Sequence, residues 1–104
     1  MMIKVLFSCP QDSTPTLLEA IMGFGQIGHY DSWSRVTPST ERFRPLAGAN
    51  PATGQINELS QVTSDKIELI CHESELEQLI QAIQKHHPYE LPAIEAFTLL
   101  IPKP

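Results

Sequence analysis

The sequence predicts an α+β fold in which two β-α-β units share one sheet. Short apolar segments rich in Ile, Val, Leu and Phe recur along the chain, and each of two helical patterns lies between two of them. The chain has 104 residues, of which 41% are hydrophobic and 18% are charged. This size and composition suit one domain with a packed core, so we expect residues 1–104 to form a single domain.

The first half of the chain predicts a strand, a helix and a second strand. Met2–Cys9 is an apolar run typical of a strand. A helix follows, with Pro15 accommodated in its first turn, apolar residues at helical spacing, and Gly23 at its end. We expect the second strand at His29–Val36. The next segment, Val36–Gln55, contains three prolines and two glycines, which predict a long irregular connection that is either functional or part of an interface.

The second half begins with two short strand patterns. Glu58–Thr63 predicts a short strand, and Ser64–Asp65 predicts a turn. Lys66–His72 alternates apolar and charged residues as far as Ile70, which indicates a strand with two different faces.

A second helix and a last strand complete the pattern. Ser74 and Glu77 form a capping-box pattern before the helix, and Pro88 ends it. Ala93–Ile101 predicts the final strand. This order gives the ferredoxin-like split β-α-β architecture. We expect the first strand and Lys66–His72 to lie side by side and parallel, with the last strand flanking the first.

Alternation along the strands separates two faces of the sheet. The face expected beneath the helices holds Ile3, Val5, Phe7, Cys9, Ile67, Leu69 and Cys71. The opposite face holds Met2, Lys4, Leu6, Glu68, Ile70, His72, Glu95, Phe97 and Leu99. Because no predicted helix covers this second face, its large apolar groups predict self-association. Parallel pairing would also place Cys9 and Cys71 at the same end of adjacent strands, where we expect buried thiols.

Charge and composition restrict the partners. Seven Lys and Arg against twelve Asp and Glu give a net charge of −5, which disfavours nucleic acid and anionic membranes as partners. Two cysteines form no disulfide framework, the start lacks a signal-peptide pattern, and no apolar run reaches the roughly 18 residues of a membrane span. We therefore expect a cytoplasmic protein.

Several motifs resemble known families. His87–Ile94 resembles the closing motif of the CutA family, whose chains share the PII-like trimeric ferredoxin fold. Gly25–Tyr30, Phe43–Leu46, and Gly48–Pro51 with Gly54 are similar to the insert domain of YqfO-type, Nif-three-like proteins. The resemblance spans nearly the whole chain. It implies a PII/CutA-like sandwich with an extra loop or short strands in its middle, assembled as a homotrimer.

The resemblance also implies a function. It indicates a small regulatory or ligand-binding module, for which we expect no catalytic activity and a small metabolite or a cation as ligand. One alternative is a divalent-cation-binding protein of the CutA kind. Another is a domain that acts in trans with a Nif-three-like metal-dependent hydrolase. Leu91, where the insert has a second Glu, and His29, where it has Asn, depart from the YqfO-type pattern.

The first candidate site is the segment of His87, Tyr89 and Glu90. Pro88 and Pro92 restrain this segment, so its imidazole, phenol and carboxylate are positioned at low entropic cost. Such groups suit a polar metabolite or a divalent cation, for which His87 and Glu90 are the predicted metal ligands. The alternative is that His87 and Tyr89 bond the carbonyls at the helix end and hold subunits together.

The second candidate site is the long connection. Gly48 and Asn50 belong to a turn in which Gly48 supplies a positive φ, and backbone N–H groups there suit an anion. Arg44 lies nearby, together with Arg35 and Arg42. The first motif adds His29 and Tyr30 as ligand-binding or interface residues. The alternative is that this loop packs against a neighbouring subunit.

Overall fold

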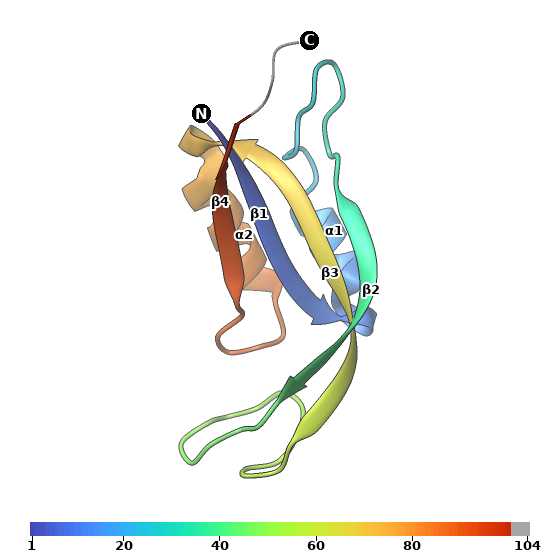
Figure 1. The fold of residues 1–104 in the computed structure, drawn as a ribbon, viewed down its shortest axis with the longest axis vertical. Coiled ribbons are helices and arrows are strands. Elements are labelled where there is room, and N and C mark those ends of the chain that lie inside the picture. The colour runs from blue at the N-terminus through green and yellow to red at the C-terminus, as the bar shows by residue number, and fades with distance from the viewer. Residues whose placement is uncertain (101–104) are drawn as a thin grey trace.

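The computed structural model, which describes residues 1–100, has an antiparallel sheet with both of its helices packed on one face (Figure 1). The strands are β1 Met2–Pro10, β2 Arg35–Phe43, β3 Ser60–His72 and β4 Ile94–Leu99, and the helices are α1 Thr14–Ala20 and α2 Leu76–His86. The strand order is β2-β3-β1-β4. This is the ferredoxin-like α+β fold, so the predicted fold class is confirmed. In the described part of the chain, no helix is long and apolar enough to cross a membrane.

The core lies between the sheet and the helices, as the alternation predicts. Strand β1 alternates strictly between buried and half-buried residues along its length. The buried core consists of Ile3, Val5, Phe7, Cys9, Leu17, Ile21, Ile67, Leu69, Cys71, Leu79 and Ile83. Burial raises the pKa of the Cys9 and Cys71 thiols, which leaves them protonated small hydrophobes at neutral pH.

The position of β2 is the largest error in the sequence prediction. The strand expected at His29–Val36 begins only at Arg35, and it continues to Phe43 through a segment expected to be irregular. Positive φ angles at Gly28 and Ser32 prevent an extended backbone before Arg35. Pro38 fits within β2 because β2 is the edge strand of the sheet, where every second backbone N–H points away from the neighbouring strand.

Two further expectations about β3 are wrong. The turn predicted at Ser64–Asp65 is absent, because these residues pair with β1 on one side and β2 on the other within one continuous strand. The parallel pairing of β1 and β3 is also wrong: they are antiparallel, since β2 and β3 form a hairpin and β2 runs parallel to β1. Cys9 therefore lies opposite Asp65 and Cys71 opposite Ile3, at opposite ends of the strands.

The helix ends also differ from the sequence patterns. The capping box before α2 joins His72 and Glu75, not Ser74 and Glu77, because a 3-10 turn at Glu73–Glu75 moves the start of the helical segment upstream. The backbone N–H of His72 donates to the Glu75 carboxylate at 3.2 Å. Pro88 follows the end of α2 as predicted. The last strand is described to Leu99, and the predicted end at Ile101 lies outside the described residues.

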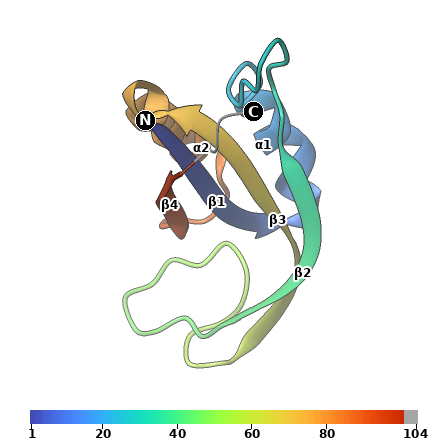
Figure 2. The same ribbon diagram turned by 45° about the horizontal axis from the view of Figure 1, so that its top comes forward.

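Strands β2 and β3 continue beyond the end of β1 as a two-stranded arm. Pro10 is the last residue of β1 and pairs with Ser64, whereas β3 begins at Ser60 and pairs there with Phe43. The arm gives the molecule its elongated shape, 49 Å long and 22 Å in the other two directions (Figure 1). In Figure 2 the connection between the two strands, residues 44–59, turns back beneath β1 and β4.

The helix-free face of the sheet has the residue set that the alternation predicts. In register across β1, β3 and β4, Met2 lies beside His72 and Leu99, Lys4 beside Ile70 and Phe97, and Leu6 beside Glu68 and Glu95. Phe97 is 46% exposed in the single chain. We call these nine residues the open face.

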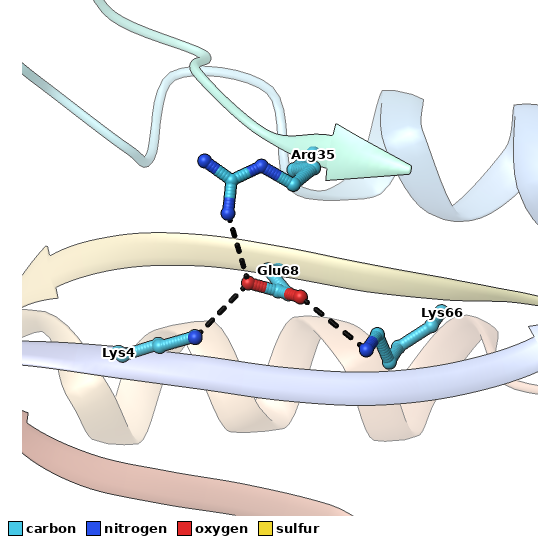
Figure 3. Close-up of polar contacts among 4 residues, drawn as sticks. All are labelled: Lys4, Arg35, Lys66 and Glu68. Carbon is cyan, nitrogen blue, oxygen red and sulfur yellow. Dashed lines mark hydrogen bonds and ion pairs between the residues drawn. The ribbon is translucent and has the colours of Figure 1, made fainter. Parts of the chain in front are cut away.

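Glu68 is the centre of charge on the open face (Figure 3). Its carboxylate lies 3.0 Å from Lys4 Nζ, 3.5 Å from Arg35 Nη1 and 3.6 Å from Lys66 Nζ. These three cations come from three strands, and Glu68 itself is only 7% exposed. The hydrogen bond from Lys4 and the surrounding positive charge lower the pKa of Glu68 despite its burial.

Glu68→Gln is expected to lower the free energy of unfolding by about 1 kcal/mol at neutral pH, since the cations themselves stay hydrated. A carboxyl group whose pKa is lowered by folding stabilises the protein above its unfolded pKa, and that contribution disappears as the pH falls through the lowered pKa. Urea denaturation at pH 7 and at about pH 3 should therefore show the difference between wild type and variant shrinking in acid. Glu58→Gln, in the exposed part of the 44–59 connection, is the matched control. An equal decrease in the free energy of unfolding for the two variants would contradict the prediction.

Candidate functional site

His87 anchors the loop that joins α2 to β4. It has an extended backbone, φ −76° and ψ 137°, as the following Pro88 requires. Its Nδ1 accepts the backbone N–H of Tyr89 at 3.1 Å, so Nε2 bears the proton and donates to the Ser8 carbonyl at 2.7 Å. The ring also packs edge-on against Phe7, with 6.4 Å between the ring centroids. Both ring nitrogens are therefore bonded to backbone, and a metal ion at either nitrogen would displace one of these bonds.

Glu90 connects the two segments that the sequence offered as separate sites. Its Oε1 accepts the backbone N–H of Asn50 at 3.0 Å, which ties the α2–β4 loop to the 44–59 connection. Gly48 has a φ of +95°, as predicted, in a turn closed by a hydrogen bond from the Ala49 N–H to the Leu46 carbonyl at 3.0 Å. The predicted residues Glu90, Gly48 and Asn50 thus lie in adjoining loops.

These two loops and the sheet enclose a cleft of about 420 Å³. Leu6 and Ser8 of β1 form part of its wall, and the 44–59 connection contributes Pro45 and Ala49. Phe43 and Tyr89 both line the cleft, and their rings contact each other at a centroid distance of 6.0 Å. We call this space the arm cleft. It is large enough for a small organic molecule, since such sites commonly measure about 300–1,000 Å³.

Two residues that line the arm cleft each have a polar atom that is buried without a partner in the described structure. The two atoms are the Tyr89 hydroxyl and Oε1 of Glu41. Burial raises the pKa of Tyr89, and the nearby Glu41 and Cys9 raise it further. The phenol is therefore protonated at neutral pH and is able to donate a hydrogen bond. Buried polar groups are normally paired, so these two atoms are unsatisfied groups beside the cleft.

The other predicted site residues lie elsewhere. His29 and Tyr30 belong to the α1–β2 loop, at the end of the molecule opposite the arm (Figure 1). Tyr30 is 79% exposed and forms an isolated bridge with Ile27. Arg44 is exposed and is not among the residues that line the arm cleft, and Arg35 bonds Glu68. In the described chain no three His, Cys, Asp or Glu side chains form a group able to hold a metal ion.

The sequence reasoning missed part of the site. Glu41 and Phe43 fell in a segment predicted to be irregular, whereas the structure places them on β2 with side chains in the arm cleft. Lys66 and Glu95 also line the cleft. The signal for Glu41 and Phe43 was their spacing of two, which puts both on one face of a strand once the segment is recognised as extended.

Comparison with known proteins relates the chain to part of larger proteins. It is 34% identical over 98 residues to the GTP cyclohydrolase 1 type 2 homolog of Halalkalibacterium halodurans, covering 92% of this chain and 26% of that protein. It is 30% identical over 101 residues to the protein of the same name from Mycobacterium tuberculosis, covering 95% of this chain and 27% of that one. The chain thus spans about a quarter of the length of these curated relatives. No family model matches it.

Two solved structures share the fold of the chain. A Bacillus cereus protein related to NIF3 superposes with a TM-score of 0.81 at 28% identity, covering 94% of this chain and 25% of that chain. The divalent cation tolerance protein Cut A1 of Thermus thermophilus gives a TM-score of 0.72 at 16% identity, covering 99% of this chain and 88% of that one. At this identity the second likeness shows the fold alone.

His87→Ala is expected to lower the free energy of unfolding by about 2–3 kcal/mol, because it leaves the Ser8 carbonyl and the Tyr89 N–H without partners and removes contact with Phe7. His86→Ala, which changes the exposed neighbour, is the matched control and should cost less than about 0.5 kcal/mol. Chemical denaturation measures both. A loss for His87→Ala no larger than that of the control would show that this histidine does not anchor the loop.

Proposed function

This chain is homologous to one segment of the Nif-three-like, YqfO-type proteins and shares its fold with CutA proteins, and from that premise we propose that it is a self-associating, ligand-binding module. The sequence relationship is the one that the three motifs predicted. The ligand is a small molecule bound in the arm cleft. The regulatory part of the proposal is that the bound ligand fixes the arm against the α2–β4 loop.

The unpaired Tyr89 hydroxyl and Glu41 Oε1 are the observation on which the proposal rests. An unpaired buried polar group destabilises a folded protein by about 1–3 kcal/mol. If both side chains turn toward the cleft, a ligand that hydrogen-bonds these atoms removes that penalty and buries its apolar surface against Phe43 and Leu6. This combination of an apolar wall with a few converging polar atoms is typical of small-molecule sites.

The arrangement of the arm cleft supports the regulatory role. Its walls come from β1, from the arm with its 44–59 connection, and from the α2–β4 loop, three segments far apart in the sequence. In the described structure the hydrogen bond between Asn50 and Glu90 joins the last two. A ligand that contacts all three segments would stabilise this arrangement, and the position of the arm would report occupancy to a partner.

The ligand proposal predicts different effects of Tyr89→Phe on folding and on binding. Removing an unpaired buried hydroxyl should raise the free energy of unfolding by about 1 kcal/mol or more. The same change should weaken a ligand that bonds the hydroxyl by about five- to tenfold.

A charge-balanced fragment library, screened by NMR on the wild-type chain, tests this prediction. Resonances of Tyr89, Phe43 and Leu6 should shift with hits, and Tyr89→Phe should reduce the affinity of those hits. Tyr30→Phe, on the exposed α1–β2 loop, is the control. No cleft resonance shifting with any fragment would refute the ligand-binding role.

Self-association is proposed to occur through the open face. Phe97, Leu99, Ile70, Leu6 and Met2 share this helix-free surface, and further copies of the chain would cover them. Light scattering at micromolar concentration should give a multiple of the 11.6 kDa chain mass, with a trimer as the expected state.

Phe97→Glu, which places a charge on this surface, should shift the mass to that of one chain without unfolding it. Tyr30→Glu introduces the same charged residue at an exposed aromatic position away from the open face and should leave the mass unchanged. A wild-type mass of a single chain would disprove self-association.

A further inference from the structure

The arm cleft has an excess of negative charge. Three carboxylate residues, Glu41, Glu90 and Glu95, line it, against a single cationic residue, Lys66. Lys66 is already engaged, since its Nζ lies 3.6 Å from Glu68 Oε1. None of the chain's arginines is among the lining residues. Three carboxylates would therefore repel an anionic ligand, with little positive charge to offset the repulsion. A cationic ligand would be attracted by the same three groups.

Glu41 is the carboxylate whose environment most requires a donor. Its Oε1 is buried with no hydrogen-bond partner in the described structure, whereas Oε1 of Glu90 already accepts the Asn50 N–H. Removing a carboxylate oxygen from water is costly unless a donor replaces the lost water. Charged N–H donors form the strongest hydrogen bonds to carboxylates, so a cationic nitrogen compensates Glu41 best.

The rest of the arm cleft suits a flat apolar body. Phe43 and Tyr89 present two rings with centroids 6.0 Å apart and planes tilted by 60°. Pro45, Pro51 and Leu91 add apolar surface around them. Aromatic faces attract cations as well as flat rings, so the two rings add to the preference of the carboxylates for a cationic ligand.

Building on the proposed ligand-binding function, we propose that the arm cleft selects an organic cation: a protonated amine or amidinium on a flat, apolar body. The Glu41 side chain turns toward the cleft so that its carboxylate accepts a hydrogen bond from the cationic nitrogen, and the body packs against Phe43 and Tyr89. The Tyr89 hydroxyl, within the same cleft, bonds a polar atom of the ligand. The carboxylates thus determine the charge of the ligand, and the aromatic pair determines its shape.

Three isosteric probes of different charge test this selection: benzamidinium, neutral benzamide and benzoate. Their affinities are measured by NMR titration, following the resonances of Tyr89 and Phe43. Benzamidinium should bind at least about tenfold more tightly than benzoate, with benzamide between them. Glu41→Gln keeps the volume and removes the charge, so it should weaken benzamidinium about tenfold and change benzamide little. Glu77→Gln, exposed on α2, is the matched control and should change none of the three.

The outcomes separate this inference from the ligand-binding role. Benzoate binding as tightly as benzamidinium would overturn the charge selection and leave the arm cleft as a ligand site. An unchanged benzamidinium affinity in Glu41→Gln, with benzamide still bound to show an intact cleft, would overturn the assignment of Glu41. Displacement of benzamidinium by an equal concentration of Zn²⁺ would assign the carboxylates to a metal and overturn the organic cation. If none of the three probes bound, the selection of an organic cation would be overturned. The fragment library tests the ligand-binding role separately.

Discussion

The pairing of β1 on both of its edges is the constraint on which the rest of the structure depends. Its nine residues pair with β3 along their whole length and with β4 along most of it. Because side chains alternate with a period of two, a slip of one residue would move Val5 and Phe7 from the core to the open face. The same pairing fixes the register of the neighbouring strands, and so the positions of Glu68 and Glu95. At its far end it presents the Ser8 carbonyl to His87, which holds the α2–β4 loop.

Burial patterns explain how much of the fold the sequence could predict. The faces of β1 and β3 follow from alternation, and Leu79 and Ile83 of α2 follow from helical spacing, because burial on one side imposes these periods. The position of β2 could not be read in this way. It is an edge strand with mostly exposed residues and an internal proline, so neither hydrophobic alternation nor strand propensity indicates it. Its extension comes from pairing with β3, a contact distant in sequence. The direction of β1 relative to β3 likewise follows from that hairpin and from no local pattern.

The candidate site was predictable only in part, for a related reason. Prolines around His87 and Tyr89, and a glycine at position 48, are local signals, and they agree with the extended backbone of His87 and the positive φ of Gly48. That Glu90 meets Asn50, forty residues away, depends on how the arm curves beneath the sheet, which no local pattern specifies. Glu41 and Phe43 escaped prediction because their chemistry is evident only when β2 places them on one face. A carboxylate in a polar-looking segment gives no sign that one of its oxygens is buried.

The arm cleft and the open face share two side chains, and this connects the two proposals. Leu6 and Glu95 lie opposite each other in the β1–β4 register, belong to the open face, and also line the cleft. The adjacent pair on the open face, Lys4 and Phe97, would be covered by a second copy. Under the two proposals, a ligand that holds Leu6 and Glu95 in one arrangement would change the surface available to that copy, and the copy would change the cleft in return. Because such coupling is reciprocal in free energy, a ligand that binds the assembled form more tightly must strengthen assembly by the same factor. Under both proposals, the module would convert the concentration of a small molecule into a change of assembly.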